Sequence, residues 1–317
     1  MSFIFAQEDI DKVSALHNPH YEPTEAETEQ STETLLIIFI ACASIATFQN
    51  LVIGVLKATH YRKHRSYQQN KINRSATDTN TGTTTNTTNQ LPSFMKTAYR
   101  ITNLAVNLVL GIYGFYHYLS SLPHLSSTPI TDRIASYTEF SKFGSLQVGY
   151  NIYSLFIGIL FMNEPPAMIV HHIAVLIVGS LSSLCRNGFR YHAPFFFGAI
   201  EISSVPLAIM NMCKDHPEWT QKRYPRVCKW IRPAFAVVFL VVRVVLWLPQ
   251  IADVLYISGL LGYTCQTNGC RVAVGMFWWS ALFLTLLQLY WASLILKGLT
   301  KAFSGGGGGG SEKTKVD

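Results

Sequence analysis

The chain has 317 residues, of which 49% are hydrophobic and only 14% are charged, while its formal net charge is +7. A soluble domain usually carries about 25% charged residues, so this composition argues against a soluble globule. The net charge does not by itself indicate nucleic-acid binding, because its meaning depends on where the basic residues lie along the chain.

Seven apolar segments have about the length of a membrane span. A bilayer core of about 30 Å needs roughly 20 apolar helical residues, because backbone polar groups in lipid must be satisfied within the segment. Seven such runs would leave too little polar sequence to cover a soluble globule. We therefore expect an all-α polytopic membrane protein with about seven transmembrane helices. In chain order the predicted spans are 34–56, 101–119, 144–162, 167–185, 193–212, 233–257 and 272–296.

The basic residues between these spans predict the orientation. The connections 57–100, 163–166, 213–232 and 297–317 together hold 18 of the 25 Lys and Arg residues, and the opposite set holds six. The positive-inside rule places the richer set in the cytosol and the N-terminus in the lumen.

This orientation gives a predicted domain organisation. The N-terminal tail contains eight acidic residues and one Lys, which favours disorder over a cleaved signal peptide. We expect an acidic lumenal tail at 1–33, an extra N-terminal transmembrane helix at 34–56, a basic and Thr/Asn-rich cytosolic linker at 57–92, a six-helix membrane domain at 93–303 and a Gly-rich cytosolic tail at 304–317.

The last residues predict a location. Lys313 and Lys315 are the fifth and third residues from the end of the sequence. This spacing resembles the dilysine pattern that retrieves membrane proteins to the endoplasmic reticulum, and the charge count already places this end in the cytosol. We therefore expect an endoplasmic reticulum membrane protein whose Lys313 and Lys315 are recognised by coat proteins.

The cysteines do not form a disulfide framework. Cys42 and Cys185 fall in predicted spans, and Cys213 and Cys228 lie near the reducing cytosol, where free thiols are expected. Cys265 and Cys270 share one short lumenal loop, where a disulfide would only staple the loop; the sequence leaves open whether it forms.

Ionisable groups within the spans are the candidate functional residues, because each costs roughly 2.5–3.5 kcal/mol to insert. The fourth span carries His171 and His172, which are rotated by about 100° from each other on a helix. At most one of them is expected at the centre of a cavity. They are either packed histidines or a general base or headgroup ligand. Two adjacent histidines alone cannot provide a tetrahedral zinc site, so no metal and no cofactor is predicted.

Two further ionisable residues follow in the next spans. Glu201 and Ser204 share a helix face, and Pro206 should kink the helix beside this acid. Arg243, one span later, is expected either to pair with Glu201 or to stack on Trp247.

Three blocks of sequence carry a family resemblance. They read His-His-Ile-Ala from His171, Gly-Ala-Ile-Glu-Ile-Ser-Ser-Val-Pro over 198–206, and Phe-Leu-Val-Val-Arg-Val-Val-Leu-Trp-Leu-Pro over 239–249. Their order and spacing resemble those of the TLC-domain family, which includes ceramide synthases, translocon-associated proteins and lipid-homeostasis proteins. The resemblance implies six helices around a central cavity, with His171 and His172 lining it near Glu201.

The resemblance also frames the activity. Ceramide synthases combine the His pair with a second His-Asp cluster in the following span, where this chain has Glu201-Ile-Ser-Ser, and many relatives have an acid where it has Ser154. The sequence therefore favours a protein that binds or senses acyl lipids and influences membrane lipid composition, with membrane lipids and acyl-CoA as its expected ligands and no nucleic acid. The alternatives are a ceramide-synthase-like N-acyltransferase using acyl-CoA, and a seven-span receptor or transporter. We expect His171, His172, Glu201, Ser204 and Arg243 to bind the ligand; in the enzyme, His171, His172 and Glu201 are the catalytic candidates.

Overall fold

The computed structural model describes residues 5–16, 25–75, 91–124 and 127–304. Within these ranges every regular element is a helix and no strand is present, which confirms the all-α prediction. The principal helices are α1 (Gln7–Ser14), α2 (Glu25–Ser75), α3 (Leu91–Ser121), α4 (Ile130–Ala135), α5 (Ser141–Ile157), α6 (Pro166–Leu184), α7 (Ala193–Phe196), α8 (Ser204–Asp215), α9 (Pro217–Arg223), α10 (Pro225–Leu240), α11 (Trp247–Thr264) and α12 (Asn268–Ser304).

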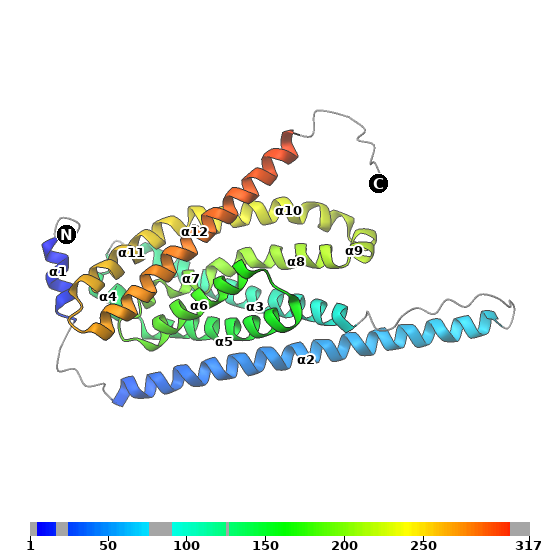
Figure 1. Cartoon of the computed structure of the whole chain (residues 1–317), viewed down its shortest axis with the longest axis horizontal. Helices are drawn as coiled ribbons and strands as arrows, with labels where there is room; N and C mark the ends of the chain where they lie inside the picture. Colours follow the sequence, from blue (N-terminus) through cyan, green and yellow to red (C-terminus); the bar gives the residue numbers. More distant parts are fainter. Residues whose placement is uncertain (1–4, 17–24, 76–90, 125–126, 305–317) are drawn as a thin grey trace.

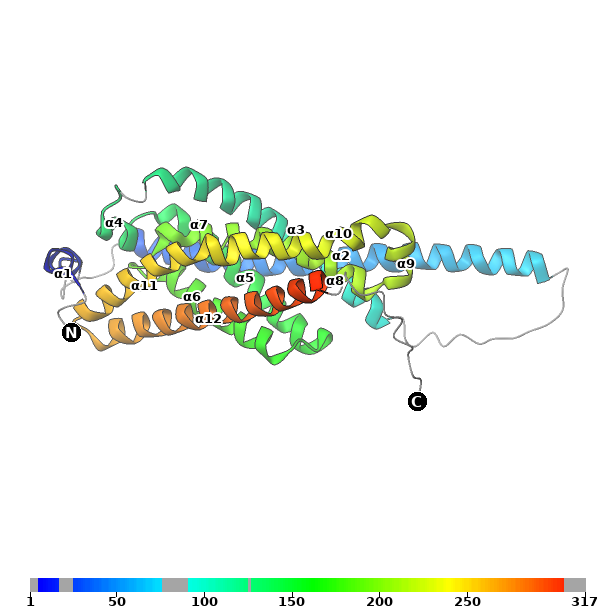
Figure 2. The same cartoon turned by 90° about the horizontal axis from the view of Figure 1, so that it is seen from above.

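The long helices form a closed ring. Helix α3 packs on α8, α8 on α10, α10 on α12, α12 on α6 and α6 on α5, and α5 returns to α3. Helix α2 lies outside this ring against α3 and α5, as Figure 1 shows along one side of the molecule. The view from above in Figure 2 separates α12 from α3, on opposite sides of the bundle. We call the end of the bundle with α1 and α4 the α1 end, and the opposite one the α9 end.

Six helical segments are long and apolar enough to cross a membrane, which supports a multi-pass membrane protein. Their bounds are Glu29–Ala58, Ile130–Met162, Pro166–Leu184, Arg190–Asp215, Pro225–Thr264 and Asn268–Lys301. The predicted span 101–119 lies in α3, whose 31 residues extend about 46 Å. This helix is not among the six, so its crossing stays a prediction. Large apolar side chains such as Phe39 and Trp279 point outward, as a lipid-facing surface requires.

The N-terminal region is more ordered than predicted. Residues 7–14 form α1, which packs on α11 and buries Val13 completely. The Tyr256 hydroxyl donates a hydrogen bond of 2.8 Å to Asp9. The prediction of a disordered tail is wrong for this segment, because α1 gains an apolar contact surface on the bundle.

Several other predicted regions differ in extent or lie outside the description. Helix α2 continues to Ser75, through the first part of the region predicted as a linker. Residues 76–90, Lys313 and Lys315 lie outside the described residues. At the α1 end, Cys265 and Cys270 form a disulfide across the connection between α11 and α12.

Three interruptions in the helices shape the interior. A π-turn at Gly158–Met162 follows α5, a 3-10 segment at Ala199–Ser203 precedes α8, and a second π-turn at Val241–Val245 separates α10 from α11. Interrupted helices leave backbone polar groups that membrane proteins tolerate where they are buried in protein or line a cavity. All three interruptions contribute residues to one cavity, namely Met162, Glu201, Ser203 and Arg243.

The kink expected at Pro206 is replaced by the break at Ala199–Ser203. Pro206 lies in the first turn of α8, where its missing N–H costs little. The break follows a close backbone contact: a Cβ on Gly114 of α3 would lie 2.3 Å from the Cα of Gly198. The chain therefore passes α3 at a distance that only two glycines allow.

Candidate functional site

A polar chamber of about 630 Å³ lies toward the α9 end of the bundle. Its volume is in the range of small-molecule binding sites. Its polar lining includes Asn103, Asn107, Asn151, Glu164 and Lys214, besides the residues predicted from the sequence. A chamber with this polar lining, inside a membrane bundle, can hold a polar group or water.

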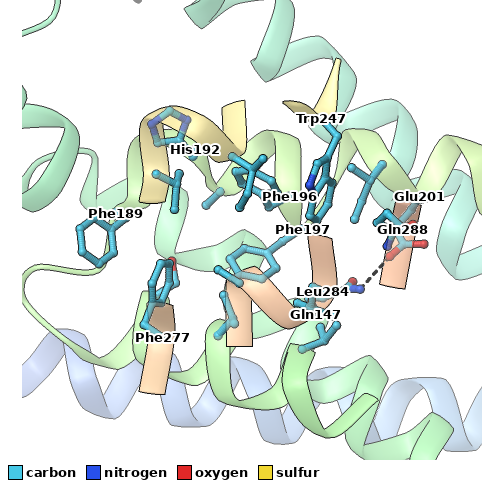
Figure 3. A pocket seen from close by; sticks show the side chains of 18 of the residues that line it. Gln147, Phe189, His192, Phe196, Phe197, Glu201, Trp247, Phe277, Leu284 and Gln288 are labelled. Carbon is cyan, nitrogen blue, oxygen red and sulfur yellow. Dashed lines mark hydrogen bonds between the residues drawn. The ribbon is translucent and has the colours of Figure 1, made fainter. Parts of the chain in front are cut away.

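A second pocket, of about 50 Å³, lies on the α1 side of the chamber. Figure 3 shows its aromatic lining, with Phe189 and Phe277 at the far end from Glu201. The rings of Phe189 and Phe277 lie 4.7 Å apart between centroids. Val175 and Val178 of α6 complete one wall. We call this the apolar pocket.

Gln147, His171 and Glu201 border both cavities. Gln147 donates a hydrogen bond of 2.8 Å from Nε2 to Oε1 of Glu201, drawn as the dashed line in Figure 3. The three side chains come from α5, α6 and the 3-10 segment. A polar boundary thus separates a polar compartment from an apolar one.

The Glu201 carboxylate is held by groups from three elements. Besides Gln147, the Ser204 hydroxyl donates to Oε2 at 2.7 Å, and Nη2 of Arg243 lies 3.7 Å from the same oxygen. Arg243 also donates from Nε to the Ser203 hydroxyl at 2.6 Å and from Nη2 to that of Ser204 at 3.1 Å. Both charged side chains are 8% exposed. The buried charges are therefore paired and hydrogen-bonded, as their burial demands.

The two ring nitrogens of His172 face different partners. The Asn151 amide donates from Nδ2 to the backbone carbonyl of Gln147 at 2.8 Å, so its Oδ1 faces His172 Nδ1 at 2.7 Å as an acceptor. His172 therefore carries hydrogen on Nδ1 and presents Nε2 to the carboxylate of Glu164, 3.4 Å from Oε2. The Tyr99 hydroxyl donates to the other carboxylate oxygen at 2.9 Å.

Glu164 reaches the chamber through a tight turn after α5. Asn163 adopts the left-handed region with φ of 48°, which reverses the chain. Gly158 provides the space, because a Cβ there would lie 2.9 Å from the Glu164 side chain. Burial of Glu164 opposes its ionisation, but the hydrogen bond and charge of His172 hold the pKa of this carboxyl below its ordinary value.

The two histidines differ in their surroundings. His171 stacks edge-on against Trp291, with ring centroids 5.5 Å apart, and borders both cavities. Its Nδ1 is buried and has no hydrogen-bond partner among the described residues. His172 borders the polar chamber but not the apolar pocket. Further along α6, Gly179 and Ser183 pack against α5 rather than line a cavity, because α5 and α6 approach closely there.

The structure brings the five predicted ligand-binding residues together around the polar chamber: His171, His172, Glu201, Ser204 and Arg243. Of the two partners proposed for Arg243, the structure selects Glu201. The guanidinium lies over the Phe239 ring, 5.8 Å from its centroid, and Trp247 instead donates to Thr285. Whether these residues bind a ligand stays a prediction.

Sequence reasoning missed Gln147, Asn151 and Glu164. Gln147 and Asn151 are uncharged, and Glu164 was assigned to a short connection between spans. A polar stripe of Gln and Asn four residues apart on an apolar helix could have indicated the first two. Among the described residues, no group of three His, Cys, Asp or Glu is placed to hold a metal ion.

A second, half-buried charged cluster lies near the α1 end. His192 Nε2 lies 2.8 Å from Oδ2 of Asp253, and the other oxygen of Asp253 accepts a hydrogen bond from Arg133. Gln250 lies against the other ring nitrogen of His192. This cluster joins α4, α11 and the turn before α7 beside the end of the apolar pocket.

Comparison with known proteins gives one family. The model of the TLC domain, described as TRAM, LAG1 and CLN8, matches residues 94–297, more than half of the chain. No curated protein and no solved structure matches the chain.

Proposed function

The chain belongs to the TLC-domain family, and on that premise we propose that it binds an acyl lipid, with the polar head in the polar chamber and a short stretch of the acyl chain in the apolar pocket. Binding of this kind would let the protein act in lipid homeostasis, by sensing or changing membrane lipid composition. Within the multi-pass membrane fold, the two cavities offer the two environments that such a molecule needs.

The observation that carries this proposal is the shared boundary of Gln147, His171 and Glu201. A lipid with its polar group at this boundary would have hydrogen-bonding side chains on one side and valine and phenylalanine on the other. The apolar pocket holds more than one water-sized group, and its apolar walls disfavour water there. An acyl chain would replace poorly bound water with apolar contacts.

The test blocks the apolar pocket and leaves the chamber intact. Val178 lines the pocket and is 7% exposed, whereas Val170 of the same helix is 46% exposed and faces outward. We expect Val178→Trp to reduce binding of a radiolabelled fatty acid to purified protein in detergent at least tenfold, and Val170→Trp to leave it unchanged. Ile251→Phe, a smaller change in the same pocket, covers the case in which Val178→Trp does not fold. Equal binding by all folded variants would refute the proposal.

A second candidate function is N-acyl transfer, and the arrangement of Asn151, His172 and Glu164 favours it. Nε2 of neutral His172 could accept the proton of an amine that attacks an acyl thioester, while the carbon–sulfur bond breaks and the thiol takes up a proton. Glu164, 3.4 Å from the same nitrogen, would then stabilise the imidazolium, while Asn151 orients the ring through Nδ1.

An assay with long-chain base and acyl-CoA separates the two functions. A lipid-binding protein forms no N-acyl product, whereas an enzyme forms product that His172→Ala abolishes. His172→Gln offers a matched control, because it keeps a hydrogen-bonding side chain but cannot act as a base near neutral pH.

The proposed membrane location of the protein rests on the distribution of its basic residues along the chain. We place the α9 end in the cytosol and the protein in the endoplasmic reticulum, with Lys313 and Lys315 recognised by coat proteins. Replacing both lysines by serine should move the protein to later compartments in fluorescence microscopy. Unchanged distribution would contradict retrieval through these lysines.

A further inference from the structure

Two free cysteines meet at the α9 end. Cys213 lies near the end of α8 and Cys228 near the beginning of α10, and helix α9 connects the two. Their Sγ atoms are 2.6 Å apart, little more than the disulfide bond length of about 2.05 Å. Both residues are half-buried, so small reagents can reach them.

The segment that carries the pair is basic. Residues 213–232 contain six Lys or Arg and two Asp or Glu. The pair thus combines short separation with access, and it is distinct from Cys42 and Cys185, which lie apart on α2 and at the end of α6.

We propose that Cys213 and Cys228 form a reversible disulfide that ties α8 to α10 and thereby restricts opening of the polar chamber. Both helices line this chamber, α8 through Asn211 and α10 through Phe235. A disulfide between the end of α8 and the beginning of α10 would keep these two walls of the chamber together. The effect on ligand entry rests on the proposed function, whereas formation of the disulfide and the tie between the helices do not.

The reaction needs only a small disulfide such as oxidised glutathione. One protein thiolate attacks it, the sulfur–sulfur bond of glutathione breaks, and a mixed disulfide forms with release of one reduced glutathione. The second protein thiolate attacks the protein sulfur of the mixed disulfide and releases the second glutathione. The two protons of the protein thiols end on the two glutathione thiols, and excess reduced glutathione reverses the sequence.

The first test is peptide mapping of the full-length protein in detergent, after treatment with oxidised or reduced glutathione. We expect a cross-linked peptide containing Cys213 and Cys228, two hydrogens lighter than the sum of its free parts, only after oxidation. Cys213→Ser should leave a glutathione adduct on Cys228 instead, and Cys42→Ser should leave the cross-link unchanged. Persistence of both free thiols in oxidised wild-type protein would overturn the proposal.

The second test addresses the tie between the helices. Hydrogen exchange at the facing ends of α8 and α10 should slow severalfold on oxidation of the wild type and stay constant in Cys213→Ser. Equal exchange in oxidised and reduced wild type would refute the restriction of opening. Neither measurement uses a lipid, so failure here is separable from failure of lipid binding.

Discussion

His172 Nε2 and Glu164 Oε2 lie 3.4 Å apart in the wall of the polar chamber, although Glu164 belongs to the connection after α5 and His172 to the second turn of α6. The left-handed residue Asn163 and the space over Gly158 bring the carboxylate back toward the bundle. The pair gives the chamber a place where one proton can be shared between an acid and a base.

This pair predicts a pH-dependent stability. The pKa of Glu164 lies below its ordinary value of 4.5, so its ionised form stabilises the fold above about pH 4.5, and this contribution is lost as the pH falls through the lowered pKa. We expect Glu164→Gln to cost about 1 to 3 kcal/mol at pH 7. The gap between the melting temperatures of wild type and variant should close in acid. A gap that is constant with pH would contradict the ionic contact.

The Glu201–Arg243 pair predicts a strong coupling. Removing one member of a buried ion pair costs about 3 to 5 kcal/mol, because the other charge is left without its partner. We expect Glu201→Gln and Arg243→Met each to lower stability by this order, measured by steric trapping in detergent. The double variant should cost less than the sum of the two single variants. Additive costs would show that the two residues act independently.

The close contact of α3 with the broken segment predicts the effect of one methyl group. Gly198→Ala would place Cβ 2.5 Å from the Cα of Gly114, and we expect a loss of about 3 kcal/mol or more. Gly275 of α12 is the control, since a Cβ there meets nothing within 4 Å. Gly275→Ala should raise stability by about 0.5 to 1 kcal/mol through helix propensity. The measurement is the melting temperature of both variants.

Arg190 is expected to stabilise the C-terminal end of α6. This buried guanidinium donates to the backbone carbonyls of Ser182, Ser183 and Cys185, at 3.1, 3.2 and 2.9 Å. Lysine cannot reproduce this planar fork. Arg190→Lys should therefore cost about 2 to 3 kcal/mol in thermal unfolding. The exposed Arg226→Lys should change stability little, and an equal loss in both would point to a general effect of arginine replacement.

Much of the fold follows from local sequence. The apolar runs predict the helices, because a bilayer admits little else, and proline marks helix starts at Pro166, Pro217 and Pro225. The ionisable residues His171, His172, Glu201 and Arg243 are predictable as site candidates because they are costly at membrane depth.

Other features depend on contacts between distant segments. The break before α8 requires Gly114 and Gly198, which are far apart in sequence and identify each other only in the folded bundle. The π-turn that carries Arg243 contains no proline or glycine from which the sequence could have predicted it. Glu164 was placed outside the site because the sequence suggested a short connection, and only the turn at Asn163 directs it inward.

The hydrogen bond between Asp9 and Tyr256 joins residues separated by 247 positions. Ribosomes add about 5 to 20 residues per second, so about 12 to 50 s pass between synthesis of the first residue and of the second. During this interval α1 cannot pack against α11, because α11 has not yet been synthesised. The N-terminal helix therefore completes its docking late in biosynthesis, after most of the ring has been made.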